Sequence, residues 1–167
     1  SIAYPSDFVG TRYRILATDL ASWNSITTPR YSVLATEAGT TTVTVTPFSA
    51  GTAGTPFTKT LSQGESYTNS FSTAEDVSGT LIEADKKVVV SSSDNCIKLT
   101  NPQSGACDAV TEFLPPVSTW GKSFILPTNS ENSIQPSNFF VTADQDGTTV
   151  TVNGTDISLD GGDTQII

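Results

Sequence analysis

Threonine and valine alternate with a period of two in two separate parts of the sequence, Thr42–Thr46 and Thr149–Val152. A period of two places successive side chains on opposite faces of a strand, and β-branched residues pack well on a pleated surface. No segment carries the sustained 3.6-residue period of an amphipathic helix, and Thr, Gly and Pro occur throughout. The sequence therefore predicts an all-β fold of antiparallel strands.

The same strand pattern occurs twice along the chain. Tyr31–Val45 contains alternating apolar residues, a turn and a Thr-Val run, and Phe139–Val152 repeats this order with a turn that is one residue shorter. Leu61–Glu65 then recurs as Leu159–Asp163, each with glycine in the fourth position. This repeat predicts two related antiparallel β-sandwich-like units in tandem.

The two predicted units differ in how much of the pattern they contain. The first, residues 1–110, continues into the strand pattern Val77–Val90, whereas the second, residues 111–167, stops at Ile167 where the matching strands are due. We therefore expect either a longer chain or a fold that is completed by a strand from elsewhere. An incomplete β unit leaves an unpaired edge, and such an edge is a template for strand addition.

Two local arrangements are predicted from the same alternation. Residues 31–46 are typical of a hairpin with its turn at Glu37-Ala38-Gly39. Val77–Ala84 and Val88–Val90 are predicted to be two strands around a charged turn, Asp85-Lys86-Lys87. The uninterrupted valines of the second strand indicate burial on both faces.

A proline- and tryptophan-containing segment is predicted to form a rigid crossover between the two units. Pro115 and Pro116 fix φ and remove two backbone donors. Trp120 is a large apolar anchor next to the permissive backbone of Gly121. Phe124–Leu126 then has the pattern of a short buried strand.

This segment also carries a resemblance to a known family. The run CDAVTEFLPPVSTWGKSFILP is preceded by GTLIEADKKVVVSSSDNC and followed by FFVTADQDGTTVTVNG. It resembles the N-terminal domain family of IgGFc-binding proteins, extracellular modules of mucus-associated animal proteins and of bacterial surface proteins. The family often has His after the Cys-Asp pair, where this chain has Ala109. The antibody binding in the family name belongs to a large mosaic protein and is not carried over to a single module.

The two cysteines, Cys96 and Cys107, flank a short segment with Asn-Pro and Ser-Gly turn steps. The ends of such a segment can meet, and a disulfide closing it would lie in the loop between the two predicted units. The alternative is a pair of free buried thiols. Two cysteines without any histidine are too few for a structural zinc site.

Charge and composition exclude several classes of function. The net charge is −9 with only 8 basic residues, so nucleic acid is a poor partner. No apolar run approaches the ~20 residues of a membrane helix, so membrane insertion is not expected. The chain has no histidine, which removes the usual general base of a serine nucleophile, and no catalytic constellation is recognisable.

Acidic residues next to glycine, and one sequon, are the remaining candidate sites. Asp144 and Asp146 lie beside Gly147 and suit either calcium ligation or a hairpin turn. Asp160–Asp163 offers the same two alternatives. Asn153 begins an Asn-Gly-Thr sequon and is also the first residue of an Asn-Gly hairpin turn. Calcium is thus the only cofactor for which the sequence offers candidate ligands.

The expected function is that of a non-enzymatic structural or adhesion module, located outside the cell or at its surface. Its partners would be other protein chains or glycoproteins of the extracellular matrix and mucus. One alternative is a subunit of an extracellular filament that assembles by β-strand exchange through a free edge. Another is a calcium- or glycan-binding module that uses the loop at Asp144 and Asp146.

Overall fold

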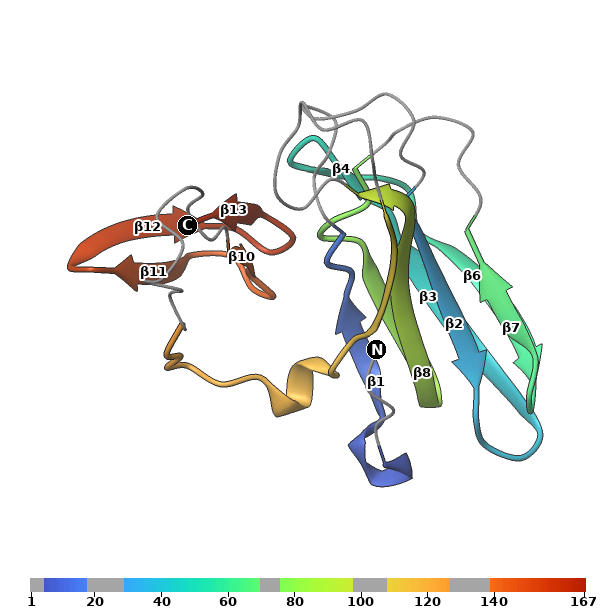
Figure 1. Ribbon diagram of the computed structural model, residues 1–167. Helices are drawn as coiled ribbons and strands as arrows, with labels where there is room; N and C mark the ends of the chain where they lie inside the picture. The colour runs from blue at the N-terminus through green and yellow to red at the C-terminus, as the bar shows by residue number, and fades with distance from the viewer. Residues whose placement is uncertain (1–4, 18–28, 70–75, 98–107, 127–138) are drawn as a thin grey trace.

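The computed structural model describes residues 5–17, 29–69, 76–97, 108–126 and 139–167 (Figure 1). In these ranges the chain forms antiparallel strands and two short 3-10 helices, and no α-helix, so the all-β prediction is confirmed. The elements, in chain order, are η1 (Ser6–Phe8), β1 (Gly10–Arg14), β2 (Arg30–Ala35), β3 (Thr40–Thr46), β4 (Phe48–Ser49), β5 (Thr52–Ala53), β6 (Phe57–Ser62), β7 (Ser66–Thr68), β8 (Leu81–Ile97), β9 (Asp108–Phe113), η2 (Val117–Thr119), β10 (Phe140–Thr142), β11 (Thr148–Val152), β12 (Thr155–Leu159) and β13 (Thr164–Ile166).

The 17-residue strand β8 organises a seven-stranded antiparallel sheet. Its first part pairs with β1 and β3, and its later part pairs with β2 and β9. Val88 is opposite both Gly10 and Ala35, at the point where the partners change. β6 and β7 extend the sheet beyond β3 and β2. Four of the strands therefore depend on β8 for a hydrogen-bonding edge.

The prediction of two strands around a charged turn is wrong, because β8 runs without interruption through Asp85, Lys86 and Lys87. Two of the charged side chains form hydrogen bonds with neighbouring backbone groups. Asp85 Oδ1 accepts a hydrogen bond from the Thr42 N–H at 2.8 Å, and Lys86 Nζ donates to the Ala38 carbonyl at 2.8 Å. β8 pairs with β3 before Asp85 and with β2 after Lys87, and this pairing outweighs the preference of the charged residues for a turn.

The hairpin prediction for residues 31–46 is also wrong. β2 and β3 are strands, as their alternation predicts, but they do not pair with each other. Both pair with β8, β2 through Val33 opposite Val90 and β3 through Val43 opposite Ala84. The two strands therefore pair with successive stretches of β8, and the connection between them lies beside Asp85–Lys87, where Thr36 Oγ1 donates to the Lys87 carbonyl at 2.8 Å.

The hydrophobic core lies among the N-terminal strands. Ten of its members come from β1, β2, β3, β6 and β8, and Ile15, Ala17 and Val77 come from the segments beside these strands. The cluster consists of Tyr13, Ile15, Ala17, Tyr31, Val33, Ala35, Val43, Val45, Leu61, Val77, Ile82, Val88 and Val90. Val88 and Val90 are buried while Val89 between them is partly exposed, so β8 is not equally covered on both faces.

The C-terminal strands form two separate two-stranded sheets, β10–β13 and β11–β12 (Figure 1, red). Asp144 and Gly162 are two residues of the C-terminal part that contact the N-terminal part. Asp144 accepts hydrogen bonds from Arg12 and Arg14 of β1. Gly162 meets Gly79 and the ring of Phe48 so closely that a Cβ atom on either glycine would overlap its neighbours.

Candidate functional site

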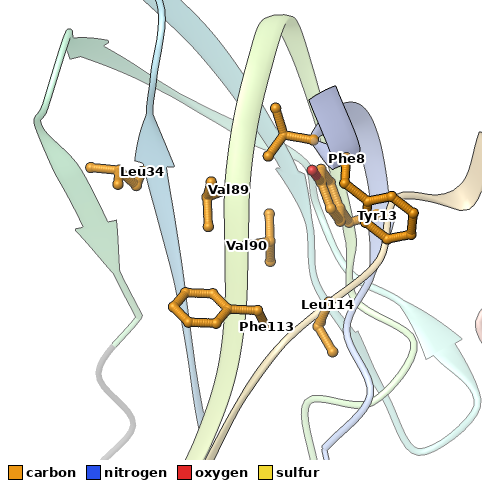
Figure 2. A pocket seen from close by; sticks show the side chains of 8 residues that line it. Phe8, Tyr13, Leu34, Val89, Val90, Phe113 and Leu114 are labelled. Atoms are coloured by element: carbon orange, nitrogen blue, oxygen red, sulfur yellow. The ribbon is translucent and has the colours of Figure 1, made fainter. Parts of the chain in front are cut away.

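An apolar groove of about 230 Å³ lies on the seven-stranded sheet (Figure 2). It brings together residues from η1, β1, β2, β8 and the end of β9, which are far apart in the sequence. The lining residues are Phe8, Val9, Tyr13, Leu34, Val89, Val90, Phe113 and Leu114. None of these side chains carries a charge, so the groove suits apolar groups of a ligand rather than ions.

The groove is lined by both buried and accessible residues. Val90 and Tyr13 are buried members of the core, whereas Phe8 and Leu34 are exposed. Leu34 lies opposite Val89 in the β2–β8 pairing, and Phe113 lies opposite Ser91 in the β8–β9 pairing. Exposed apolar side chains that lie together are a feature of protein-binding surfaces.

Hydrogen bonds hold Tyr13 in place below the rim. Its hydroxyl donates to the Val88 carbonyl at 2.6 Å and accepts from the Gly10 N–H at 2.8 Å. Burial raises the pKa of the Tyr13 hydroxyl above its ordinary value, although the hydrogen bond from Gly10 acts in the opposite direction. The hydroxyl therefore stays protonated and ties β1 to β8 beneath the groove.

The Pro115–Gly121 segment packs beside the groove and contacts β1 through η2. The indole Nε1 of Trp120 donates to the Pro115 carbonyl at 3.2 Å, and the Trp120 N–H donates to the Val117 carbonyl at 3.0 Å. A Cβ atom on Gly10 would lie 2.6 Å from Cβ of Pro116. Glycine in β1 therefore leaves the space that Pro116 fills.

The prediction of a buried strand at Phe124–Leu126 is wrong. None of the three residues is in a strand, and the Ile125 side chain is 96% exposed. Their apolar pattern is that of a strand, but no described segment pairs with them. The segment is therefore an exposed apolar surface that follows the Trp120-Gly121 pair.

The two aspartates predicted as calcium ligands have protein partners in this structure. Asp144 forms ion pairs with Arg12 and Arg14, at 3.1 Å and 3.2 Å from Oδ1. Asp146 Oδ1 accepts from the Gly161 N–H at 2.9 Å. In the ranges that the structure describes, no three acidic, histidine or cysteine side chains gather as a metal site. Calcium binding stays a prediction, and these contacts supply a structural role for both residues.

Asn153 is an exposed residue in the turn between β11 and β12. Asn153 has φ of 50° and Gly154 has φ of 82°, the positive values that a tight hairpin turn requires at both central positions. The turn interpretation of this Asn-Gly pair is thus confirmed. The accessibility of the side chain is compatible with glycosylation, which stays a prediction.

The predicted disulfide lies partly outside the described residues, because Cys107 belongs to the range 98–107. Cys96 is a backbone position of β8. The described strands on either side are paired, with Ile97 opposite Asp108. The backbone that follows Cys96 therefore lies opposite the backbone that follows Cys107, as a disulfide that closes this short loop requires. The disulfide itself stays a prediction.

The groove residues were not singled out in the sequence, although one of them carried a signal. Leu34 alternates with the core residues Val33 and Ala35, so it lies at a position otherwise occupied by polar Ser32 and Thr36. An apolar side chain on the polar face of a strand indicates a contact surface. Phe8 and Phe113 carried no comparable signal, since only the tertiary fold brings them to Leu34.

The described residues form an all-β protein whose antiparallel sheet presents an apolar groove. The chain belongs to the IgGFc-binding protein family: the family model described as "IgGFc binding protein" matches residues 1–166. The resemblance of the CDAVTEFLPPVSTWGK segment and its flanks is thereby confirmed. No curated protein and no solved structure matches the chain. None of the helices in the described ranges has the length and apolar character needed to cross a membrane.

Proposed function

We propose that this chain is a non-enzymatic extracellular module with a structural or adhesive role, and that it binds a protein partner at the apolar groove. The observation that carries the proposal is the exposure of Phe8 and Leu34 at an apolar groove whose lining also includes the buried Tyr13 and Val90. Large apolar side chains at an accessible rim lose contact with water when a partner covers them, which stabilises the complex.

The family supports a protein partner of extracellular origin. The description of the family names the Fc part of immunoglobulin G. The resemblance implies that modules of this family occur in mucus-associated proteins. Either an immunoglobulin or a mucus or matrix glycoprotein would bring apolar side chains to the groove. The net charge of −9 keeps the rest of the surface soluble and favours partners without strong negative charge of their own.

The test is a binding measurement on immobilised IgG Fc and on immobilised mucus glycoprotein. Leu34→Thr introduces a β-branched residue that suits strand β2 but removes the apolar rim, and it should weaken binding at least tenfold. Thr58→Ser, on the exposed face of β6, is the matched control and should bind like the unchanged protein. Equal binding by Leu34→Thr, or no binding to either surface, would contradict the proposal.

A second candidate, a filament subunit joined by β-strand exchange, is favoured by a different observation. β10 and β11 each pair with only one neighbour among the described residues, whereas the related strands β2 and β3 each pair with two. A free edge of this kind accepts strands readily. This candidate predicts large assemblies by light scattering of the native protein, and a solely monomeric protein would exclude it.

A further inference from the structure

Four glycines of the sequence directly follow a residue whose side chain ends in an amide or a carboxyl group. The pairs are Gln63-Gly64, Asp146-Gly147, Asn153-Gly154 and Asp160-Gly161. All four lie in ranges that the structure describes. Such a pair closes a ring when the glycine nitrogen attacks the side-chain carbonyl carbon of the residue before it. Glycine favours this attack because it has no Cβ atom and its backbone rotates freely.

Three of the four glycine nitrogens already donate a hydrogen bond. The Gly64 N–H donates to the Ala35 carbonyl at 2.8 Å. The Gly147 N–H donates to Asp160 Oδ1 at 2.9 Å, and the Gly161 N–H donates to Asp146 Oδ1 at 2.9 Å. The last two hydrogen bonds are reciprocal, because each aspartate binds the glycine that follows the other. Each of these nitrogens must lose its hydrogen bond before it attacks, which slows ring closure.

The Gly154 nitrogen has no such partner. In the part of the chain that the structure describes, no hydrogen bond engages the Gly154 N–H, and both Asn153 and Gly154 are exposed. The two residues form the turn between β11 and β12, and Val152 opposite Thr155 is the last pair of that ladder. The ends of a ladder open at a low cost in free energy, so the turn changes its backbone angles without unfolding of the sheet.

The side chains of the pairs also differ in reactivity. Asn153 carries a neutral amide, whereas Asp146 and Asp160 carry carboxyl groups that are acceptors of hydrogen bonds. The negative charge of an ionised carboxylate repels a nucleophile, and a neutral amide has no such charge. Hydrogen bonding and electrophile therefore both favour ring closure at Asn153 over the two aspartates.

We infer that Asn153 is a site of spontaneous deamidation through a cyclic imide, with water as the co-reactant. The Gly154 nitrogen loses its proton and bonds to Cγ of Asn153. The bond between Cγ and Nδ2 breaks, and Nδ2 takes up protons and leaves as ammonia. Water then opens the ring at one of its two carbonyl carbons. Attack at Cγ gives aspartate, and attack at the backbone carbonyl carbon gives isoaspartate.

The two products change the hairpin in different ways. Aspartate keeps the backbone and adds one negative charge to a chain whose net charge is −9. Isoaspartate directs the main chain through Cβ and Cγ, which lengthens the turn by one methylene group. The present turn depends on positive φ at both central positions, 50° at Asn153 and 82° at Gly154. The longer turn therefore no longer fits the pairing of Val152 with Thr155.

The effect of isoaspartate reaches the whole hairpin because of its surroundings. Among the described residues, β11 and β12 pair only with each other. A two-stranded sheet has little stability of its own, so it depends strongly on the turn that joins its strands. Deamidation of Asn153 would thus loosen β11 and β12 and leave the strands of the N-terminal part in place.

The test follows the whole chain during incubation in mildly alkaline buffer at body temperature. Mass spectrometry of peptide fragments detects the mass gain from amide to carboxyl, and chromatography separates isoaspartate from aspartate. Synthetic peptides with the sequences of residues 143–150, 150–157 and 157–164 give the rate of each pair without the fold. The rate in the peptide divided by the rate in the chain is the protection by the fold, and the apolar groove has no part in it.

We expect Asn153 to convert to both products in the folded chain. The protection should be at least tenfold greater at Asp146 and Asp160 than at Asn153. Asp146→Ala frees the Gly161 N–H, so the protection at Asp160 should fall. Thr155→Val is the matched control, because it removes the glycosylation sequon but keeps the Asn-Gly pair, and it should deamidate like the unchanged protein. Hydrogen exchange in β11 and β12 should be faster in the aged protein.

Three outcomes would overturn the inference. The first is an Asn153 that stays intact in the folded chain while its peptide converts, because the turn would then hold the pair closed to attack. The second is equal protection at Asn153, Asp146 and Asp160, because the free Gly154 N–H would then make no difference. The third is aspartate without isoaspartate, because direct hydrolysis of the amide gives aspartate alone and needs no ring.

Discussion

Gly79 and Gly162 meet where the two parts of the chain contact each other, and a Cβ atom on Gly79 would lie 2.0 Å from the Gly162 carbonyl oxygen. The ring of Phe48 fills the adjoining space, at 2.6 Å from the Cβ position of Gly162. Gly79 also has φ of 85°, which disfavours any side chain. This contact therefore depends on the absence of a side chain for two independent reasons.

Gly79→Ala should lower the free energy of unfolding by about 2–4 kcal/mol, because the new methyl group overlaps backbone and the left-handed φ is strained. Gly64→Ala is the matched control. Gly64 has φ of 81° but no atom within 4 Å of its Cβ position, so only the backbone strain of about 1 kcal/mol applies. Urea unfolding measures both values. Equal losses in the two variants would show that the Gly79–Gly162 contact does not form in solution.

Asp144→Asn should lower the free energy of unfolding by roughly 1–3 kcal/mol, since Arg12 and Arg14 both lose a charged acceptor in a partly buried setting. Glu83→Gln removes the other, more exposed partner of Arg12 and should cost less than about 1 kcal/mol. Thermal unfolding at two salt concentrations separates the two effects, because salt screens the exposed pair more strongly.

The same Asp144 variant also bears on calcium binding. A rise in the melting temperature of the unchanged protein with calcium chloride, absent in Asp144→Asn and Asp146→Asn, would assign both carboxylates to the cation. No such rise is expected while the arginines and the Gly161 N–H occupy these carboxylates.

Two buried tyrosines predict a loss of stability at alkaline pH. Burial raises the pKa of both Tyr13 and Tyr31, and for Tyr31 the neighbouring Tyr67 raises it further. A folded-state pKa above the unfolded value of about 10 means that the stability contribution is fully present below pH 10. It is lost as the pH rises through the folded-state values. Stability against urea should therefore fall above about pH 10.

Tyr13→Phe tests whether the Tyr13 hydroxyl contributes to the loss of stability at alkaline pH. The variant loses the hydrogen bonds with Val88 and Gly10, so it should be about 1–2 kcal/mol less stable at neutral pH. Its stability should also decrease less steeply above pH 10 than that of the unchanged protein. An identical alkaline profile in the two proteins would show that Tyr13 does not contribute.

The alternating patterns predicted which segments are strands better than how these strands pair. β2, β3 and β11 lie where alternation places them. The continuous strand β8 was not predicted, because Asp85-Lys86-Lys87 is locally typical of a turn. Pairing partners on both edges decide its conformation, and these partners come from distant parts of the sequence. Local pattern therefore identifies strands, while tertiary contacts determine the sheet.

The exposure of an apolar side chain also depends on neighbouring strands that come from distant parts of the sequence. Phe124–Leu126 has the composition of a buried strand, but burial requires a neighbouring strand that no local pattern reports. The groove also forms only in the folded chain, which brings Phe8, Leu34 and Phe113 together from distant parts of the sequence. Of these three residues only Leu34 carries a local signal in the sequence, as an apolar residue on a polar strand face, and it was not used as a prediction.

The native protein should be about 2 Da lighter than its reduced form in mass spectrometry, because we predict a disulfide between Cys96 and Cys107. The paired positions Ile97 and Asp108 bring the flanking backbone together, which is the geometric condition for closing the loop. A disulfide that closes so short a loop stabilises by roughly 3 kcal/mol through the unfolded state. Reduction should therefore lower the melting temperature, and Cys96→Ser should reproduce that change. An unchanged mass on reduction, with two thiols that react only after unfolding, would instead establish a pair of free buried cysteines.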